Sequence, residues 1–176
     1  MTTLMTSLAE IRSFDPCYTG WKNILSAHPH TCEEDYQKQF PLVDCIESNS
    51  ISNVCWLIGK RKTEINICVS FAQACADSVT RLNNKYAAKA ASYAAVATAS
   101  YAANSAASYA AAVAAAADAA FYASEAAVSE AAANAVAVDA EAIDVANAVA
   151  DAVDAQNTKN KQFLIDAINN YYHVNK

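Results

Sequence analysis

The sequence predicts an all-α fold in which short N-terminal helices pack on a bundle or coil of long alanine-rich helices. Glycine and proline are rare, with two and three among 176 residues, so the chain lacks the turn residues that an all-β fold needs. Residues 86–155 are about half alanine, the best helix former, and contain neither glycine nor proline. An apolar stripe with helical spacing between positions 65 and 82 indicates the same fold class.

Short helices are expected near the N-terminus. Ser7 and Glu10 have the spacing of a capping box at the start of a short turn over residues 8–11. Residues 18–28 follow Pro16 and carry apolar residues on one helical face. The sequence therefore predicts one helical turn and one short helix in this segment.

The next segment predicts a connector and two further short helices. Residues 33–38 are expected to be a charged connector. Pro41 is suited to the first turn of a helix that runs to about residue 47, because the N–H that proline lacks has no partner there. Residues 51–58 predict another helix, which Gly59 is expected to end.

The clearest helix of the N-terminal part is expected to start near Thr63. Its apolar residues recur with alternating spacings of three and four, which is the a/d pattern of an amphipathic helix. The stripe consists of Ile65, Cys68, Ala72, Cys75, Val79 and Leu82.

The alanine-rich part is too long to stand as one helix. A single rod over residues 86–155 would span about 100 Å at 1.5 Å per residue, so folding into antiparallel helices is expected. Without glycine or proline, polar residues are the best candidates for the breaks. The candidate break points are Asn104 and Ser105, residues 129–134, and Asn157 and Thr158.

The chain is predicted to divide into two parts. Residues 1–85 have mixed composition and form an N-terminal helical subdomain. Residues 86–176 form the alanine-rich helical region, and a separate amphipathic helix over residues 160–173 is expected to close one end of the bundle.

Tyrosines recur through the start of the alanine-rich part. Tyr86, Tyr93, Tyr101 and Tyr109 are spaced by 7, 8 and 8 residues, which favours a right-handed coil of the row. Two interpretations remain open for Tyr93, Tyr101 and Tyr109. These side chains either fill gaps that alanines leave, with wet hydroxyls, or line a small-molecule pocket between helices.

The formal net charge is -6, and the acidity belongs to one segment. Residues 90–158 contain no lysine or arginine, whereas acids and bases balance in the preceding part. Direct binding to nucleic acid is therefore not expected, and an acidic helical face is expected to attract a basic protein surface. The alternative is that these acids form only the solvated face of an amphipathic helix. The residues predicted to bind the partner are Asp139, Glu141, Asp144, Asp151 and Asp154.

The cysteines and histidines do not predict a metal site. The six cysteines contain no C-x-x-C pair, and disulfides are not expected. The cysteines other than Cys32 are interpreted as small core residues. His28, His30 and Cys32 form an H-x-H-x-C run, for which loop and core roles are favoured over metal binding. No cofactor and no metal are predicted.

Catalysis is not expected either. There are only three histidines to serve as a positioned base, and two isolated glycines cannot make a phosphate-binding loop. No stretch has the pattern of a secretion signal or a membrane span, because the long apolar region consists of small residues interrupted by acids. A cytoplasmic, non-enzymatic protein with no membrane partner is expected.

A series of short motifs resembles a known group of proteins. The chain has a PC-x-x-GW run at residues 16–21, then VDCIESN at 43–49, VCWL at 54–57 and FAQACA at 71–76. In this order, ahead of an alanine-rich region, these motifs resemble the alanine-rich immunity-protein group of bacteria and their phages, which is similar to the immunity proteins of polymorphic toxin systems. The resemblance implies an all-α binding protein in a bacterial host cell. The chain departs from the group in having no arginine in residues 90–158.

The leading hypothesis is therefore a protein inhibitor or immunity protein. It would block a toxin or a defence-system component that handles nucleic acid, and in a phage it would be an anti-defence factor such as an anti-CRISPR protein. Two alternatives stay open: a self-assembling alanine-rich helical protein, which would be a homo-oligomer, and a sponge for a small molecule such as a nucleotide signal.

Overall fold

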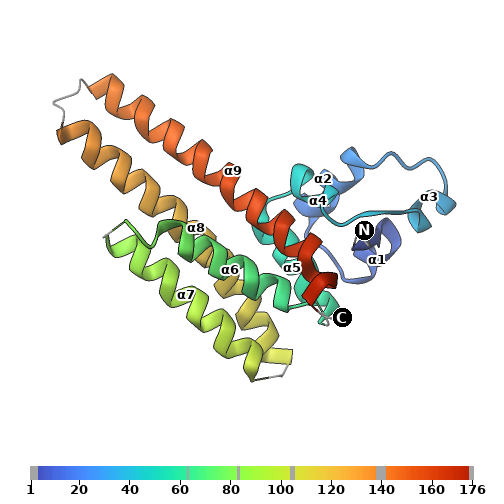
Figure 1. The fold of residues 1–176 in the computed structure, drawn as a ribbon. Coiled ribbons are helices and arrows are strands. Elements are labelled where there is room, and N and C mark those ends of the chain that lie inside the picture. Colours follow the sequence, from blue (N-terminus) through green and yellow to red (C-terminus); the bar gives the residue numbers. More distant parts are fainter. Residues whose placement is uncertain (1–3, 63, 83, 104–105, 138–141, 175–176) are drawn as a thin grey trace.

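The computed structural model describes residues 4–62, 64–82, 84–103, 106–137 and 142–174. The fold over these residues is all-α apart from one small sheet, as the composition predicts (Figure 1). The helices are α1 (Leu8–Ser13), α2 (Tyr18–Ala27), α3 (Glu33–Gln37), α4 (Asp44–Ser48), α5 (Ile51–Arg61), α6 (Asn66–Val79), α7 (Lys85–Ala102), α8 (Ala106–Ala137) and α9 (Ala142–Val174).

A two-stranded antiparallel sheet, which the sequence did not predict, ties the N-terminus to the segment before α4. Strand β1 (Met5–Ser7) pairs with β2 (Gln39–Pro41), and Leu42 N donates to Leu4 O at 2.8 Å. The prediction that Pro41 starts a helix is therefore wrong. Pro41 ends an edge strand, where a missing N–H is tolerated, and the helix begins only at Asp44.

The predicted cap of α1 is half confirmed. The Glu10 backbone N–H donates to Ser7 Oγ at 3.2 Å, as a capping residue requires. The Glu10 carboxylate does not return to the cap, however. It pairs with Arg61 of α5, which also donates to Met5 O at 2.6 Å. Through Arg61, whose side chain is almost fully buried, α5 is fastened to both β1 and α1.

Two details of the short helices differ from the expectation. The charged connector over residues 33–38 contains a helical turn, α3, because the Asp35 carboxylate accepts from the backbone N–H groups of Thr31 and Cys32 just before it, as in a capping box. Gly59 does not end α5, which continues to Arg61. A Cβ at Gly59 would lie 2.4 Å from Val113 Cγ2, so the glycine is required by the close approach of α5 to α8.

The predicted amphipathic helix is confirmed as α6. It begins at Asn66, three residues after the predicted start, and its apolar stripe faces the core. In Figure 1, α6 lies within the bundle of long helices, where it packs against α7, α8 and α9. The division of the chain into two parts at residue 85 stays a prediction. α6 lies before that position in the sequence but packs against the alanine-rich helices that follow it.

The alanine-rich part folds into three antiparallel helices. α7 ends at Ala102 and α8 begins at Ala106, on either side of the predicted break at Asn104 and Ser105, which lies outside the described residues. The other two predicted breaks are wrong. α8 continues through residues 129–134, and α9 continues through Asn157 and Thr158. Polar residues in these places do not stop the helices, because serine and asparagine weaken a helix only slightly and tertiary contacts decide.

The predicted closing helix is the C-terminal half of α9. The helix runs unbroken from Ala142 to Val174, so residues 160–173 are not a separate element. Its second half buries Leu164 and Ile168 against the bundle, and its first half lies along α8. Figure 1 shows α8 and α9 running side by side past the ends of α6 and α7, away from the N-terminal helices.

Candidate partner-binding surface

A pair of helices extends beyond the bundle and carries the predicted acidic residues. Asn84, just before α7, donates to Ala126 O of α8 at 3.2 Å, and Ser78 near the end of α6 accepts from Gln156 of α9 at 3.2 Å. Past these two levels α8 and α9 continue side by side beyond the ends of α6 and α7 (Figure 1). We call residues 127–137 and 142–155 the arm (Figure 1).

The arm presents acids to solvent. Asp144, Asp151 and Asp154 are all exposed on α9, so the structure presents these three predicted residues to solvent along one helix. We call this surface the acidic stripe. Asp139 and Glu141 lie outside the described residues. Ile143, which is 67% exposed, adds an apolar side chain beside Asp144.

A buried polar cluster fixes which face of α9 is exposed. Asn160 is 1% exposed, and its Nδ2 donates to Ala120 O at 3.0 Å and to Ser124 Oγ at 3.2 Å. Its Oδ1 accepts from Gln156 Nε2 at 3.0 Å and from Cys75 Sγ at 3.6 Å. Because amides buried without partners are costly, only one rotation of α9 satisfies this cluster. That rotation turns the acidic stripe outward.

Sequence reasoning missed this cluster. The signal was the spacing: Gln156 and Asn160 are four residues apart and continue into Leu164 and Ile168 at the same spacing. Two amides that share a stripe with two core apolar residues indicate buried polar groups rather than a helix break.

A groove runs along α8 beside the acidic stripe. It consists of two adjoining cavities of about 490 and about 870 Å³, which share Ser52 and Ala117. We call it the α8 groove. The first cavity lies between α5 and α8. The second cavity is lined by residues 49–52, by α8 and by α9. Asp154 lines the second cavity, so the groove and the acidic stripe meet.

Large aromatic side chains line this groove. Phe121 of α8 is 57% exposed, whereas every buried apolar residue described between positions 86 and 155 is an alanine. Trp56 of α5 and Tyr109 of α8 line the other cavity. Aromatic residues are enriched in the surfaces with which proteins bind one another.

The predicted tyrosine row does not form one pocket. Tyr93 of α7 stacks on Tyr122 of α8, with ring centroids 5.2 Å apart, and Tyr122 also receives Lys89 over its ring at 4.8 Å. The electrostatic effect of the Tyr122 hydroxyl, together with burial, raises the pKa of Tyr93. Tyr101 is exposed, and Tyr109 lines the cavity between α5 and α8. Tyr93 thus fills a gap between helices.

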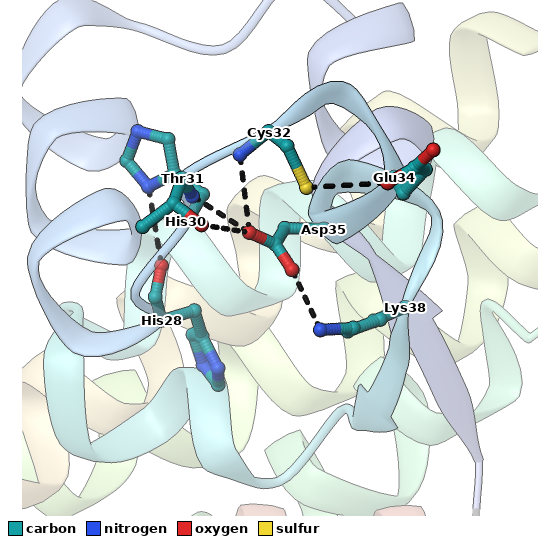
Figure 2. Close-up of polar contacts among 7 residues, drawn as sticks. All are labelled: His28, His30, Thr31, Cys32, Glu34, Asp35 and Lys38. Atoms are coloured by element: carbon teal, nitrogen blue, oxygen red, sulfur yellow. Dashed lines mark hydrogen bonds and ion pairs between the residues drawn. The ribbon is translucent and has the colours of Figure 1, made fainter.

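The H-x-H-x-C run does not converge on a metal. Figure 2 shows the two histidine rings and the Cys32 thiol pointing apart. The His28 ring stacks on Phe40 at 3.8 Å, the His30 ring meets Tyr36 edge-on at 5.2 Å, and Cys32 Sγ donates to Glu34 at 3.5 Å. Within the described ranges no group of three such side chains could hold a metal ion.

Four cysteines are buried, as the sequence predicts, whereas Cys17, which was predicted to lie in the core, is exposed; all six are free. Burial raises the pKa of Cys45 to about 12 and raises that of Cys75 further, so both remain thiols at neutral pH. The exposed thiol of Cys17 caps α2 by accepting from Gly20 N at 3.4 Å. It stands on the rim of a cavity of about 370 Å³ between α1, α2 and α5.

The apolar length of α8 raises the question of a membrane. Among the described residues one stretch, Tyr109–Ala135, is long and apolar enough to cross a bilayer. It is also the helix that contacts α5, α6, α7 and α9, and the core helix of a soluble protein meets the same criteria. The expectation that no membrane is bound stays a prediction.

Comparison of the chain with protein-family models, with curated proteins and with solved structures gave no match.

Proposed function

We propose that this chain is a non-enzymatic inhibitor that binds a basic protein, of the kind that handles nucleic acid, through the acidic stripe on its arm. The observation that carries this proposal is the arm itself. Asp144, Asp151 and Asp154 are exposed on a helix pair that extends beyond α6 and α7 (Figure 1), in a segment, residues 90–158, without a lysine or arginine.

Electrostatics select the class of partner. Phosphate groups would be repelled by the stripe, whereas a nucleic-acid-binding protein presents clustered lysine and arginine. Complementary charges of this kind act mainly on the association rate and on specificity, and salt weakens them over about 8 Å at physiological ionic strength. The immunity or anti-defence role that the motifs imply is one form of such inhibition.

The proposal is tested by charge reversal. The tagged wild-type chain and the variant Asp144→Lys with Asp151→Lys are used side by side to capture proteins from a bacterial lysate that contains nucleic-acid-handling defence systems, at low and at high salt. A protein that wild type retains only at low salt, and that the variant loses, supports the proposal. Activity of that protein must fall when wild-type chain is added and remain when the variant is added.

A matched control separates the stripe from net charge. Glu33→Lys with Asp44→Lys changes the charge equally on exposed residues of α3 and α4, outside the arm. This control should capture the partner as wild type does. Equal capture by the stripe variant would refute the proposal, and recovery of the chain alone would favour self-assembly.

A further inference from the structure

We infer that the α8 groove is the docking site for an amphipathic helix of the partner protein, with basic residues at the end that meets Glu125 and Asp154. The inference rests on the proposed function and deepens it, because Asp154 belongs to the acidic stripe and to the groove. The stripe attracts the partner, and the groove recognises one element of it.

The groove has the length of a helix. Its α8 side extends from Tyr109 to Val128, which corresponds to about 28 Å at 1.5 Å per residue, or about five helical turns. Helix-in-groove recognition uses an apolar stripe laid along such a channel. The described part of the chain offers no sheet edge along this face, so an added strand would find no hydrogen-bonding partners there.

The groove surface suits a helix in shape. Ala110, Ala114 and Ala117 line it on α8, and their small side chains allow a second helix to approach closely. Phe121 projects from the same side and remains 57% exposed. A single exposed aromatic residue among alanines is the kind of anchor that carries a large share of binding energy.

The charges at the two ends differ. Glu125 and Asp154 line one end, and the lysine there, Lys161, lies 3.9 Å from Glu47 of α4. Lys60 and Lys62 of α5 line the other end. A helix with basic residues at one end therefore fits in one direction, with those residues at the Glu125 end.

The test uses synthetic helical peptides of about 18 residues, or five turns. The panel has leucine, phenylalanine or alanine on one face and lysine on the other, and each peptide has a twin with glutamate in place of lysine. Calorimetry with the full chain should give micromolar binding for at least one lysine peptide and at least tenfold weaker binding for its twin. Absence of binding by every lysine peptide, or equal binding by the twins, would overturn the inference.

Two pairs of variants locate the binding. Phe121→Ser removes the anchor, and Val96→Ser removes an exposed valine of α7 that lies outside the groove. Ala114→Leu obstructs the groove, and Ala91→Leu makes the same change on the exposed side of α7. The groove variants should each weaken the peptide about tenfold, and the α7 variants should not change it. Equal effects within either pair would place the peptide elsewhere.

The partner itself then separates this inference from the proposed function. Loss of capture by Asp144→Lys with Asp151→Lys, together with normal capture by Phe121→Ser and Ala114→Leu, would keep the stripe and overturn the groove. Loss of capture by the two groove variants, with normal capture by the stripe variant, would keep the groove and overturn binding through the stripe. A wild-type dimer that Phe121→Ser dissociates would make a second copy the occupant, and would overturn the inference.

Discussion

The N-terminal part of the molecule and its alanine-rich part fill their cores with side chains of different size. Residues 4–82 bury leucine, isoleucine, valine, cysteine and Phe71 around short helices and a two-stranded sheet. Between positions 86 and 155 every buried apolar side chain that the structure describes is an alanine. Large side chains gain stability from the apolar area they bury, whereas alanines gain it from helix propensity and close helix approach.

This difference predicts opposite sensitivities to mutation. In the first part, removing atoms leaves a cavity. In the second part the buried alanine side chains have only one carbon atom to remove, whereas a larger side chain forces closely packed helices apart. The buried amides of Gln156 and Asn160 then supply the orientation that alanines, being alike on every face, cannot supply.

The largest effect is expected from truncation in the first part. Phe71 is completely buried in α6, and Phe71→Ala should lower the free energy of unfolding by about 3–5 kcal/mol. Urea unfolding followed by circular dichroism measures the change. Ala119→Gly, a truncation at an equally buried position of α8, should cost only about 1 kcal/mol. Similar losses for the two variants would contradict the comparison.

Enlargement in the alanine-rich part should come next. Ala116 is fully buried in α8, and Ala116→Leu should destabilise the chain by up to about 3 kcal/mol through overpacking. The same change at exposed Ala91 of α7 should stay within about 0.5 kcal/mol. Thermal and urea unfolding of both variants provide the measurement. If Ala116→Leu were neutral, the helices would not be packed as closely as alanine allows.

Loss of the polar cluster should have an intermediate effect. Asn160→Leu leaves Gln156 Nε2, which donates to Asn160 and Ser78, with one acceptor fewer, and it removes the donor to Ala120 O and Ser124 Oγ. The expected cost is about 2 kcal/mol. A buried amide that loses its partner destabilises the fold more than two amides that are removed together. Gln156→Leu should therefore cost less free energy of unfolding in the Asn160→Leu variant than in wild type. Strict additivity in this double-mutant cycle would show that the two amides do not act as one cluster.

The sequence predicted the parts of this fold that depend on local chemistry. Alanine content and the a/d stripe predicted the helical class and α6, and charge counting predicted the acids that the structure exposes on α9. The failures depend on contacts between distant residues. Pro41 belongs to a strand because it pairs with Met5, and residue 59 of α5 must be a glycine because of Val113. No local pattern reveals such partners.

The candidate site was predictable only in part for the same reason. The acidic stripe follows from periodicity along one helix. The α8 groove depends on where α5 and α9 lie relative to α8, and Phe121 was visible in the sequence only as one aromatic residue among alanines. Whether such a residue fills a core or lines a groove is decided by helix packing.

The smallest effect concerns a partly buried capping carboxylate, that of Asp35, in the N-terminal part; the described residues of the alanine-rich part have no counterpart to it. Lys38 Nζ donates to Asp35 at 2.6 Å, and Thr31 N and Cys32 N donate at 2.6 and 3.2 Å (Figure 2). These bonds, that from Lys38 first, hold the pKa of Asp35 well below its usual value of 3.8.

Asp35→Asn should therefore destabilise the chain modestly, with a pH dependence of known sign. A carboxylate whose pKa is lowered by folding stabilises the fold above its unfolded pKa and loses that contribution as the pH falls through its folded pKa. The difference between wild type and Asp35→Asn should be full at neutral pH and shrink as the pH is lowered below about 4. Urea unfolding over this range measures it, with Glu33→Gln in the same helix as a control whose difference from wild type stays small. A gap for Asp35→Asn that does not change with pH would mean that the carboxylate charge plays no part in holding α3.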